Sequence, residues 1–170
     1  MPYMGKLLHE VGHAVFLGVI WRSTELNLFR ISEIDMPIFG VSASYSSPIP
    51  GSSIAKVILA FQPEEKVLEI YKNADVRAYT DRTITSLDVY LKEMEKVRMA
   101  GYGINDEEIH PGIRSLAGPI RRFDAEVIAG LSVGGYIPME DLLRLAPKIL
   151  DYCRMISFSL GYNAESMPKV

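Results

Sequence analysis

The residues best suited to chemistry stand together near the start of the chain, in the run His9-Glu10-Val11-Gly12-His13. This run matches the H-E-x-x-H pattern. On a continuous helix, its two histidines lie one turn apart and bind Zn²⁺, while the glutamate activates the metal-bound water. Taken alone, the pattern suggests a zinc metallopeptidase.

Three features of the sequence argue against that hypothesis. The pattern needs a helix that continues through His13, but the apolar run from Ala14 is typical of a strand, with Gly12 at the break. A zinc site needs a third protein ligand, and the only other histidine, His110, lies far along the chain. A peptidase also usually has a longer segment before its metal-binding helix. We therefore expect a helix-to-strand turn here, with no metal, no other cofactor and no enzymatic activity.

The bulk composition describes a soluble globular domain. The chain has 170 residues, of which 48% are hydrophobic and 23% charged, and its net charge is −3. This length suits one domain, and the negative charge argues against a self-sufficient DNA-binding surface.

The single cysteine, Cys153, excludes an internal disulfide and lies on an apolar helical stripe, where we expect it in the core. Apolar runs are too short to span a bilayer and no signal peptide is visible, so we expect a cytoplasmic protein without membrane contact.

The order of secondary structure follows from the spacing of apolar residues. We predict a helix over Met4–Val11, strands over Ala14–Trp21 and Glu25–Ile31, and loop or edge strand over Ser42–Ser53. A helix is expected where apolar residues recur at helical spacing, at Ile54, Val57, Ile58 and Phe61.

The second half of the chain continues this order. The segment Gln62-Pro63-Glu64-Glu65 is typical of a helix start, and a third apolar stripe runs from Ile84 to Val97 and ends near Gly101. Three strands and a long closing helix follow, at Tyr102–Ile104, Ile113–Ile120, Glu126–Val133 and Met139–Leu160, with a hairpin turn at Arg121–Ala125. Short turns between neighbouring strands favour an antiparallel sheet, and the grouped helices make the fold class α+β.

Several segments, taken in order, carry a family resemblance. Pro48–Lys56 is similar to the pattern Pro-Leu-His-Ala-Thr-Ala-x-Gly-Lys, and Arg98–Glu108 is similar to Arg-x-x-Gly-Tyr-(small)-x-Asp-x-Glu-Glu. Leu7–Ile20, Gly112–Ile120 and Glu126–Gly134 take their places in the same order. Over roughly residues 5–162, the chain resembles the C-terminal domain of IclR-family transcriptional regulators.

The resemblance implies a GAF-like fold, an antiparallel sheet flanked by helices, and one effector-binding and oligomerisation domain over residues 1–170. It implies a small organic effector, with a carboxylate expected, and a homodimer or tetramer. In the family, DNA contact belongs to an N-terminal winged helix-turn-helix domain. Nothing in this chain corresponds to that domain, and the sequence leaves open whether the chain is an isolated domain or a natural truncation. An alternative is an oligomerisation domain whose vestigial pocket is small or filled by side chains.

The resemblance also implies where the effector binds. One wall of the pocket is expected from Met36, Phe39, Ser47, Ser52, Ser53 and Ile54. The other wall is expected from Ile113, Ser115, Ser132 and Gly134, with Asn105 or Asp106 at the mouth. Independently of the family, free N–H groups where a helix begins near Ser52 or Ser53 favour an anion there.

The neighbouring charged residues and the departures from the family pattern complete these expectations. We expect Asp106-Glu107-Glu108 to form a solvated turn, and Arg114 to attract an anionic ligand. Pro50 replaces the usual His, Ala55 replaces Gly, and Ser115 stands where Cys or another small residue is frequent. Gly134 replaces a second Ser, so we expect a larger or less polar pocket and carry over no effector identity.

Overall fold

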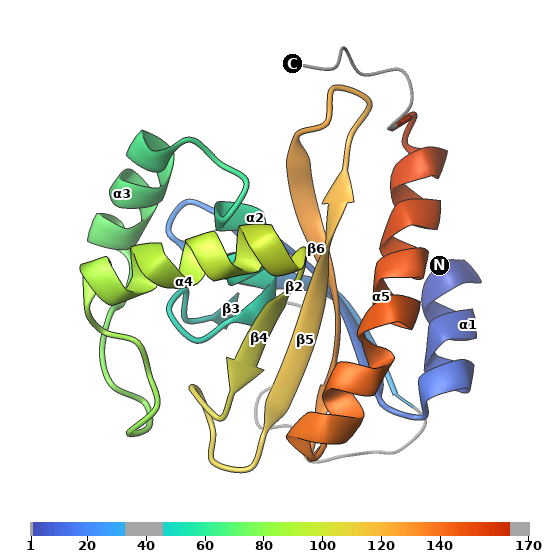
Figure 1. Cartoon of the computed structure of the whole chain (residues 1–170), viewed down its shortest axis with the longest axis horizontal. Helices are drawn as coiled ribbons and strands as arrows, with labels where there is room; N and C mark the ends of the chain where they lie inside the picture. Colours follow the sequence, from blue (N-terminus) through green and yellow to red (C-terminus); the bar gives the residue numbers. More distant parts are fainter. Residues whose placement is uncertain (1, 33–45, 164–170) are drawn as a thin grey trace.

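The computed structural model describes residues 2–32 and 46–163, in which five helices and six strands follow one another (Figure 1). Their order agrees with the order expected from the sequence. The elements are α1 (Pro2–Val11), β1 (Ala14–Trp21), β2 (Thr24–Ile31), β3 (Ser46–Ser47), α2 (Ser53–Leu59), α3 (Glu64–Asn73), α4 (Leu87–Ala100), β4 (Gly103–Asp106), β5 (Arg114–Arg121), β6 (Val127–Gly135) and α5 (Met139–Ser159).

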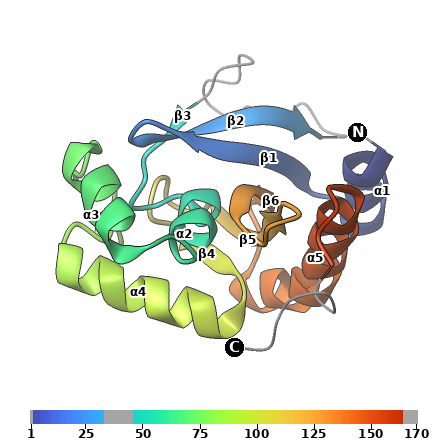
Figure 2. The ribbon, with the colours of Figure 1, turned by 90° about the horizontal axis from the view of Figure 1, so that it is seen from above.

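The strands form one antiparallel sheet in the order β3-β2-β1-β6-β5-β4. Strand β1 pairs with both β2 and β6, which joins the N-terminal hairpin to the three C-terminal strands. The sheet curls strongly, and α2 lies inside the curl with α3 and α4 beyond it, while α1 and α5 cover the opposite face (Figure 2). The expected α+β class and antiparallel sheet are confirmed.

Successive side chains along each strand point to opposite faces of the sheet, so the core is divided between these two faces. On β1, Val15 packs with the α1 and α5 side, whereas Phe16 packs with the α2 side. On β6, Leu131 and Val133 pack with the α5 side, and Ser132 between them faces the other way. Both faces of β6 are buried, which explains why this strand is apolar almost throughout.

Helix α2 differs from the amphipathic helix that the sequence pattern predicted. All of its residues are buried, including Lys56, and it ends at Leu59, before Phe61. The curled sheet surrounds one side of the helix and α4 covers another, so no side is left for solvent. Close packing depends on glycine: a Cβ atom added at Gly103 of β4 would lie 2.7 Å from the backbone oxygen of Ser53.

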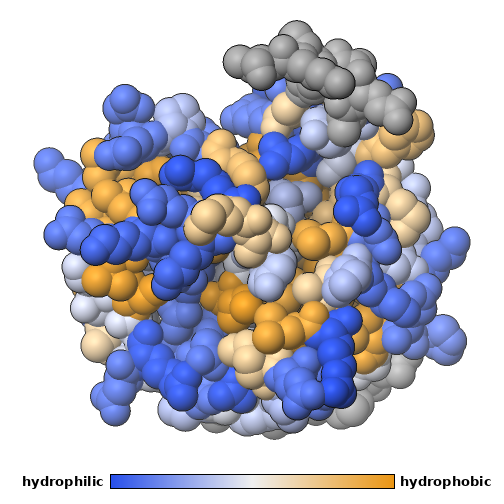
Figure 3. Space-filling model, viewed as in Figure 1, coloured by the Kyte–Doolittle hydropathy of each residue, from blue (hydrophilic) through white to orange (hydrophobic). Residues whose placement is uncertain are grey.

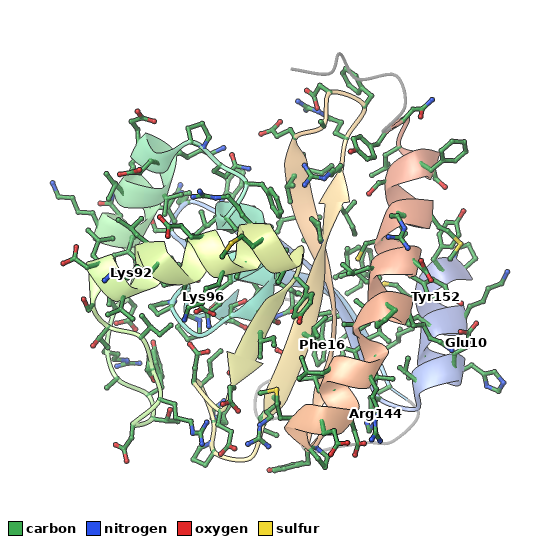
Figure 4. All side chains as sticks on the ribbon, viewed as in Figure 1. Glu10, Phe16, Lys92, Lys96, Arg144 and Tyr152 are labelled. Carbon is green, nitrogen blue, oxygen red and sulfur yellow. The ribbon has the colours of Figure 1, made fainter. Side chains whose placement is uncertain are left out.

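The N-terminal elements explain the H-E-x-x-H run. Helix α1 ends at Val11, Gly12 has a left-handed φ of +67°, and His13 lies outside the helix, as expected. Glu10 accepts a hydrogen bond from the Tyr152 hydroxyl at 2.8 Å and pairs with Lys148, which ties α1 to α5 (Figure 4). Within residues 2–32 and 46–163, no three His, Cys, Asp or Glu side chains gather in a way that could hold a metal ion.

The structure places strand β4 differently from the prediction: it begins at Gly103, one residue later than expected, and continues to Asp106. The described part of the Ser-rich segment agrees with the expected loop or edge strand, because the very short strand Ser46–Ser47 pairs with β2 at the edge of the sheet. Only Ser53 differs, since it is already the first residue of α2.

The molecular face in Figure 3 shows apolar areas broken up by polar side chains. In the described part of the chain, no helix combines the length and the apolar character that a membrane crossing requires.

The packing of β4 against α2 predicts a strong effect for Gly103→Ala. The new Cβ would meet backbone, which cannot rotate away, so we expect the free energy of unfolding to fall by about 1–3 kcal/mol. Gly5→Ala is the matched control, because a Cβ at Gly5 in α1 meets nothing within 4 Å. Helix propensity predicts that this control gains up to about 1 kcal/mol. Urea unfolding of both variants checks the pair, and equal effects would contradict the packing argument.

Candidate functional site

A cavity of about 270 Å³ lies between the first turn of α2, the sheet, and the loop that joins β4 to β5. Its apolar lining comes from Phe16, Ile54, Ile109, Pro111 and Ile113. Its polar lining comes from Glu25, Asn27, Ser47, Ser52, Ser53, Asn105, His110, Ser115, Ser132 and Tyr136, with Gly134 and Gly135 completing the wall.

The structure brings together most of the residues that the sequence analysis proposed for ligand binding. Those lining the cavity are Ser47, Ser52, Ser53, Ile54, Asn105, Ile113, Ser115, Ser132 and Gly134. Met36 and Phe39 lie outside the described residues. Asp106 does not line the cavity. That any of these residues contacts a ligand stays a prediction.

Asp106 is held away from the cavity by two arginines. One carboxylate oxygen pairs with Arg82, and the other accepts a hydrogen bond from Nε of Arg114 at 2.6 Å. Arg114 also pairs with Glu107. Arg114 is therefore already engaged by carboxylates of its own chain, and the expectation that it attracts an anionic ligand finds no support in this arrangement.

The expectation of a solvated acidic turn was wrong for Glu108. Its carboxylate is buried and lies 2.5 Å from Nζ of Lys56, which is itself only 1% exposed. The ammonium also donates to the carbonyl of Ile104 at 2.9 Å. Burial raises the pKa of Glu108, and the neighbouring Lys56 opposes that rise. The turn folds back over α2, and this returns Glu108 to the interior although its neighbours stay near the surface.

Three serine hydroxyls meet on the α2 side of the sheet. The Ser53 hydroxyl is 2.8 Å from that of Ser115 on β5 and 3.3 Å from that of Ser132 on β6. A Cβ at Gly134 would lie only 2.8 Å from the Cβ of Ser115, so the glycine lets β5 and β6 approach closely here. That Gly134 makes the pocket larger or less polar stays a prediction. The Ser52 hydroxyl caps the helix by accepting a hydrogen bond from the backbone N–H of Ala55 at 3.0 Å.

Glu25 is a cavity residue that the sequence analysis missed. It lies on β2 with 1% exposure, and its Oε2 accepts hydrogen bonds from Nδ2 of Asn27 at 3.3 Å and from the Ser52 hydroxyl at 3.4 Å. Its Oε1 has no hydrogen-bond partner among the described residues. Burial raises the pKa of Glu25 to about 7, and hydrogen bonds from Ser47 and Ser52 offset only part of this effect. A glutamate at the turn between two strands usually faces solvent, so the pattern gave no signal.

The buried ion pair predicts that removing one of its two charges destabilises the protein more than removing both. Lys56→Met leaves Glu108 buried without its cation, so we expect a loss of about 3–5 kcal/mol in the free energy of unfolding. The double variant Lys56→Met with Glu108→Leu removes both charges and should recover a large part of that loss.

Lys96→Met is the matched control for this experiment. Lys96 pairs with Glu93 at 3.4 Å but is 72% exposed, so its loss should change stability by less than about 1 kcal/mol. Chemical denaturation of the single, double and control variants gives the comparison. A double variant no more stable than Lys56→Met would show that the charges are not the cause.

The buried carboxyl of Glu25 predicts a pH-dependent stability. Because the folded state raises its pKa, the folded protein holds the proton more tightly, so this stabilisation is complete below pH 4.5 and is lost as pH rises through about 7. The loss amounts to about 3 kcal/mol. Glu25→Gln cannot titrate, so its free energy of unfolding, relative to the natural chain, should rise by that amount over this range. Urea unfolding between pH 4.5 and 8 measures the difference, and a constant difference contradicts the assignment.

Comparisons with known proteins agree on one family. The family described as "Bacterial transcriptional regulator IclR C-terminal" matches residues 1–157. The HTH-type transcriptional regulator KdgR of Escherichia coli K12 is 32% identical over 120 residues, which cover 69% of this chain and 46% of that protein. The chain thus spans about half the length of this relative.

Solved structures of the same architecture are also known. The C-terminal domain of E. coli KdgR superposes with a TM-score of 0.85 at 27% identity and covers 95% of both chains. The inducer-binding domain of the PobR transcription factor from Acinetobacter has a TM-score of 0.81 at 19% identity, covering 92% of this chain and 94% of its own. The second likeness concerns the fold alone.

Proposed function

This chain belongs to the IclR family of bacterial transcriptional regulators, and on that premise we propose that it is an effector-sensing domain, cytoplasmic and oligomeric. The proposed effector is a small organic molecule bound in the cavity between α2 and the sheet. The observation that carries this proposal is the cavity itself, in which apolar side chains and several hydroxyl groups converge from separate elements.

The elements around the cavity suit a sensor. Ser53 belongs to α2, Ser115 and Ser132 belong to β5 and β6, and Asn105 belongs to β4. A ligand that contacts several of these elements stabilises one arrangement of them over others. Through a homodimer or tetramer, this preference would alter how the paired N-terminal winged helix-turn-helix domains of the whole regulator are held on DNA.

We propose a carboxylate on the effector, for three reasons. The serine hydroxyls can donate hydrogen bonds to carboxylate oxygens. Arg30 stands beside the cavity wall, with its guanidinium carbon 6.0 Å from the ring centre of Phe16, and its buried Nε and Nη2 have no partner among the described residues. The related PobR domain, in double-mutant form, was solved as a complex with 3-hydroxybenzoic acid, which carries such a group.

The alternative is an oligomerisation domain with a vestigial pocket. That hypothesis expects a small cavity or one filled by side chains. A volume of about 270 Å³, bordered by a buried carboxyl group and by a cluster of hydroxyls, favours the sensing function.

The proposal predicts a thermal shift when the chain is screened against small organic acids. Ser132→Leu places a large side chain at the cavity wall, so it should abolish the shift that a hit produces. Ser159→Leu is the matched control, because Ser159 lies on the exposed surface of α5 and should leave the shift unchanged.

Ser132 is buried, so its variant needs a test of folding by circular dichroism and by its own melting temperature. Ser115→Leu serves as a second variant from a neighbouring strand and should have the same effect. A broad screen without any hit, or hits that both cavity variants retain, contradicts the proposed function.

A further inference from the structure

The hairpin of β1 and β2 has an outer face, which points away from α2, and this face is apolar. Phe16 and Ile20 of β1 pack on the α2 side of the sheet. Leu17 and Val19 pack on the opposite side, toward the core under α1 and α5. Because side chains alternate along a strand, Trp21 follows Leu17 and Val19 on the outer face. The outward positions of β1 from Leu17 to Trp21 are therefore all large and apolar.

Strand β2 adds apolar side chains to the same face. Leu26 is the partner of Val19, and Phe29 is the partner of Leu17, so each points to the same side of the sheet as its partner. The register shifts between these two pairs, and Leu28 is the extra residue of the bulge. The bulge thus sets two neighbouring apolar residues, Leu28 and Phe29, opposite Leu17.

Much of this outer face is open to solvent. Trp21 is 62% exposed, Leu28 45% and Phe29 46%. Helix α1 contacts one end of the hairpin, but no helix of the described residues lies over the rest of the outer face (Figure 2). The two aromatic side chains alone expose roughly 250 Å², about a third of the ~800 Å² that each partner buries in a standard protein interface. The remaining area has to come from the aliphatic neighbours and the polar rim.

Among the described residues of β1 and β2, no charged side chain points to this face. The charged residues of β2 lie on the other side, since Glu25 lines the cavity and the Arg30 guanidinium stands over the ring of Phe16. Thr24, the partner of Trp21, is polar but uncharged. The outer face is therefore apolar with a neutral border at its turn end.

A neutral apolar face is suited to a second copy of the same chain. A twofold axis brings a surface against itself, so a charged residue near the axis meets its own like charge. The outer face of the hairpin avoids that repulsion. It also offers Trp21 and Phe29, and aromatic residues are enriched in the cores of protein interfaces, where they contribute most of the binding energy.

We propose that the outer face of the β1–β2 hairpin packs against the same face of a second copy of this chain across a twofold axis, with Trp21 and Phe29 near its centre. This inference rests on the oligomeric state proposed above and assigns a surface to it. Glu25 and Asn27 line the cavity from the opposite side of β2. The strand that holds the second copy is thus also a wall of the proposed ligand site.

Sedimentation velocity over a concentration series tests the inference. We expect the natural chain to be dimeric at micromolar concentrations. Trp21→Lys places a cation near the axis in both copies, so it should weaken self-association at least about thirtyfold. Phe29→Lys should act in the same direction.

Two further variants guard the interpretation. Met99→Lys is the matched control, because Met99 is 82% exposed on α4, across the molecule from the hairpin (Figure 2), and should leave the dimer unchanged. Trp21→Thr adds no charge and keeps a residue that favours strands, so it should still weaken the dimer if Trp21→Lys folds poorly. Circular dichroism and the melting temperature report on the folding of each variant.

The other outcomes overturn the inference. A dimer that the variants at Trp21 and Phe29 leave intact assigns oligomerisation to a different surface, while the oligomeric state stands. An equal loss in Met99→Lys shows that the effect does not belong to the hairpin. A natural chain that stays monomeric at every concentration removes both the inference and the proposed oligomerisation of this domain. In each case the thermal-shift screen with organic acids judges effector sensing separately.

Discussion

The cavity depends on one buried interaction, the ion pair between Lys56 of α2 and Glu108 of the loop between β4 and β5. Both partners come from elements that border the cavity. The same loop is held from outside, because Thr83 donates a hydrogen bond to the carbonyl of Glu108, whose own N–H donates to Oδ1 of Asn105 at 2.9 Å. The pair therefore fixes the distance between the helix start and the opposite wall, and it does so at a position where either charge alone would be costly.

The curl of the sheet is the second constraint. It brings β1, β4, β5 and β6 around α2, and the strand faces that touch the helix include glycines and a small side chain, as at Gly103, Gly130 and Ser132. These residues let the helix approach the sheet closely, and the cavity described above lies at the start of the helix, where Ser52 caps it and Ser53 is its first residue. The site is thus a consequence of how the helix fits the curl, rather than of one loop.

Much of the fold could be predicted from the sequence because local rules decide it. Alternating or continuous apolar runs located β1, β2 and β6 closely, and Gly12 correctly marked the end of α1, which removed the metallopeptidase hypothesis. Ser53, Ser115 and Ser132 could be named together because they lie in segments with a family resemblance. Neither the periodicity nor the composition would have joined these three positions.

The rest depended on contacts between residues far apart in the chain. Glu25 and Glu108 are charged residues beside turns, for which local rules predict exposure, yet both are buried. Asp106 was expected at the cavity mouth and is instead bound by Arg82 and Arg114. In each case the position of the side chain is decided by a residue on another element, either by its side chain, as with Lys56, or by the room that a glycine leaves, as with Gly18. The sequence pattern within one segment does not reveal such a contact.

The central claim is that this cavity is a ligand site with Glu25 and the serine cluster at its two sides. A crystal structure of the chain with the tightest-binding acid tests it most directly. We predict electron density for the acid in the cavity, with its carboxylate within hydrogen-bond distance of the serine hydroxyls of Ser53, Ser115 and Ser132. Density for the acid elsewhere on the molecule, with the cavity closed by side chains, would contradict the account.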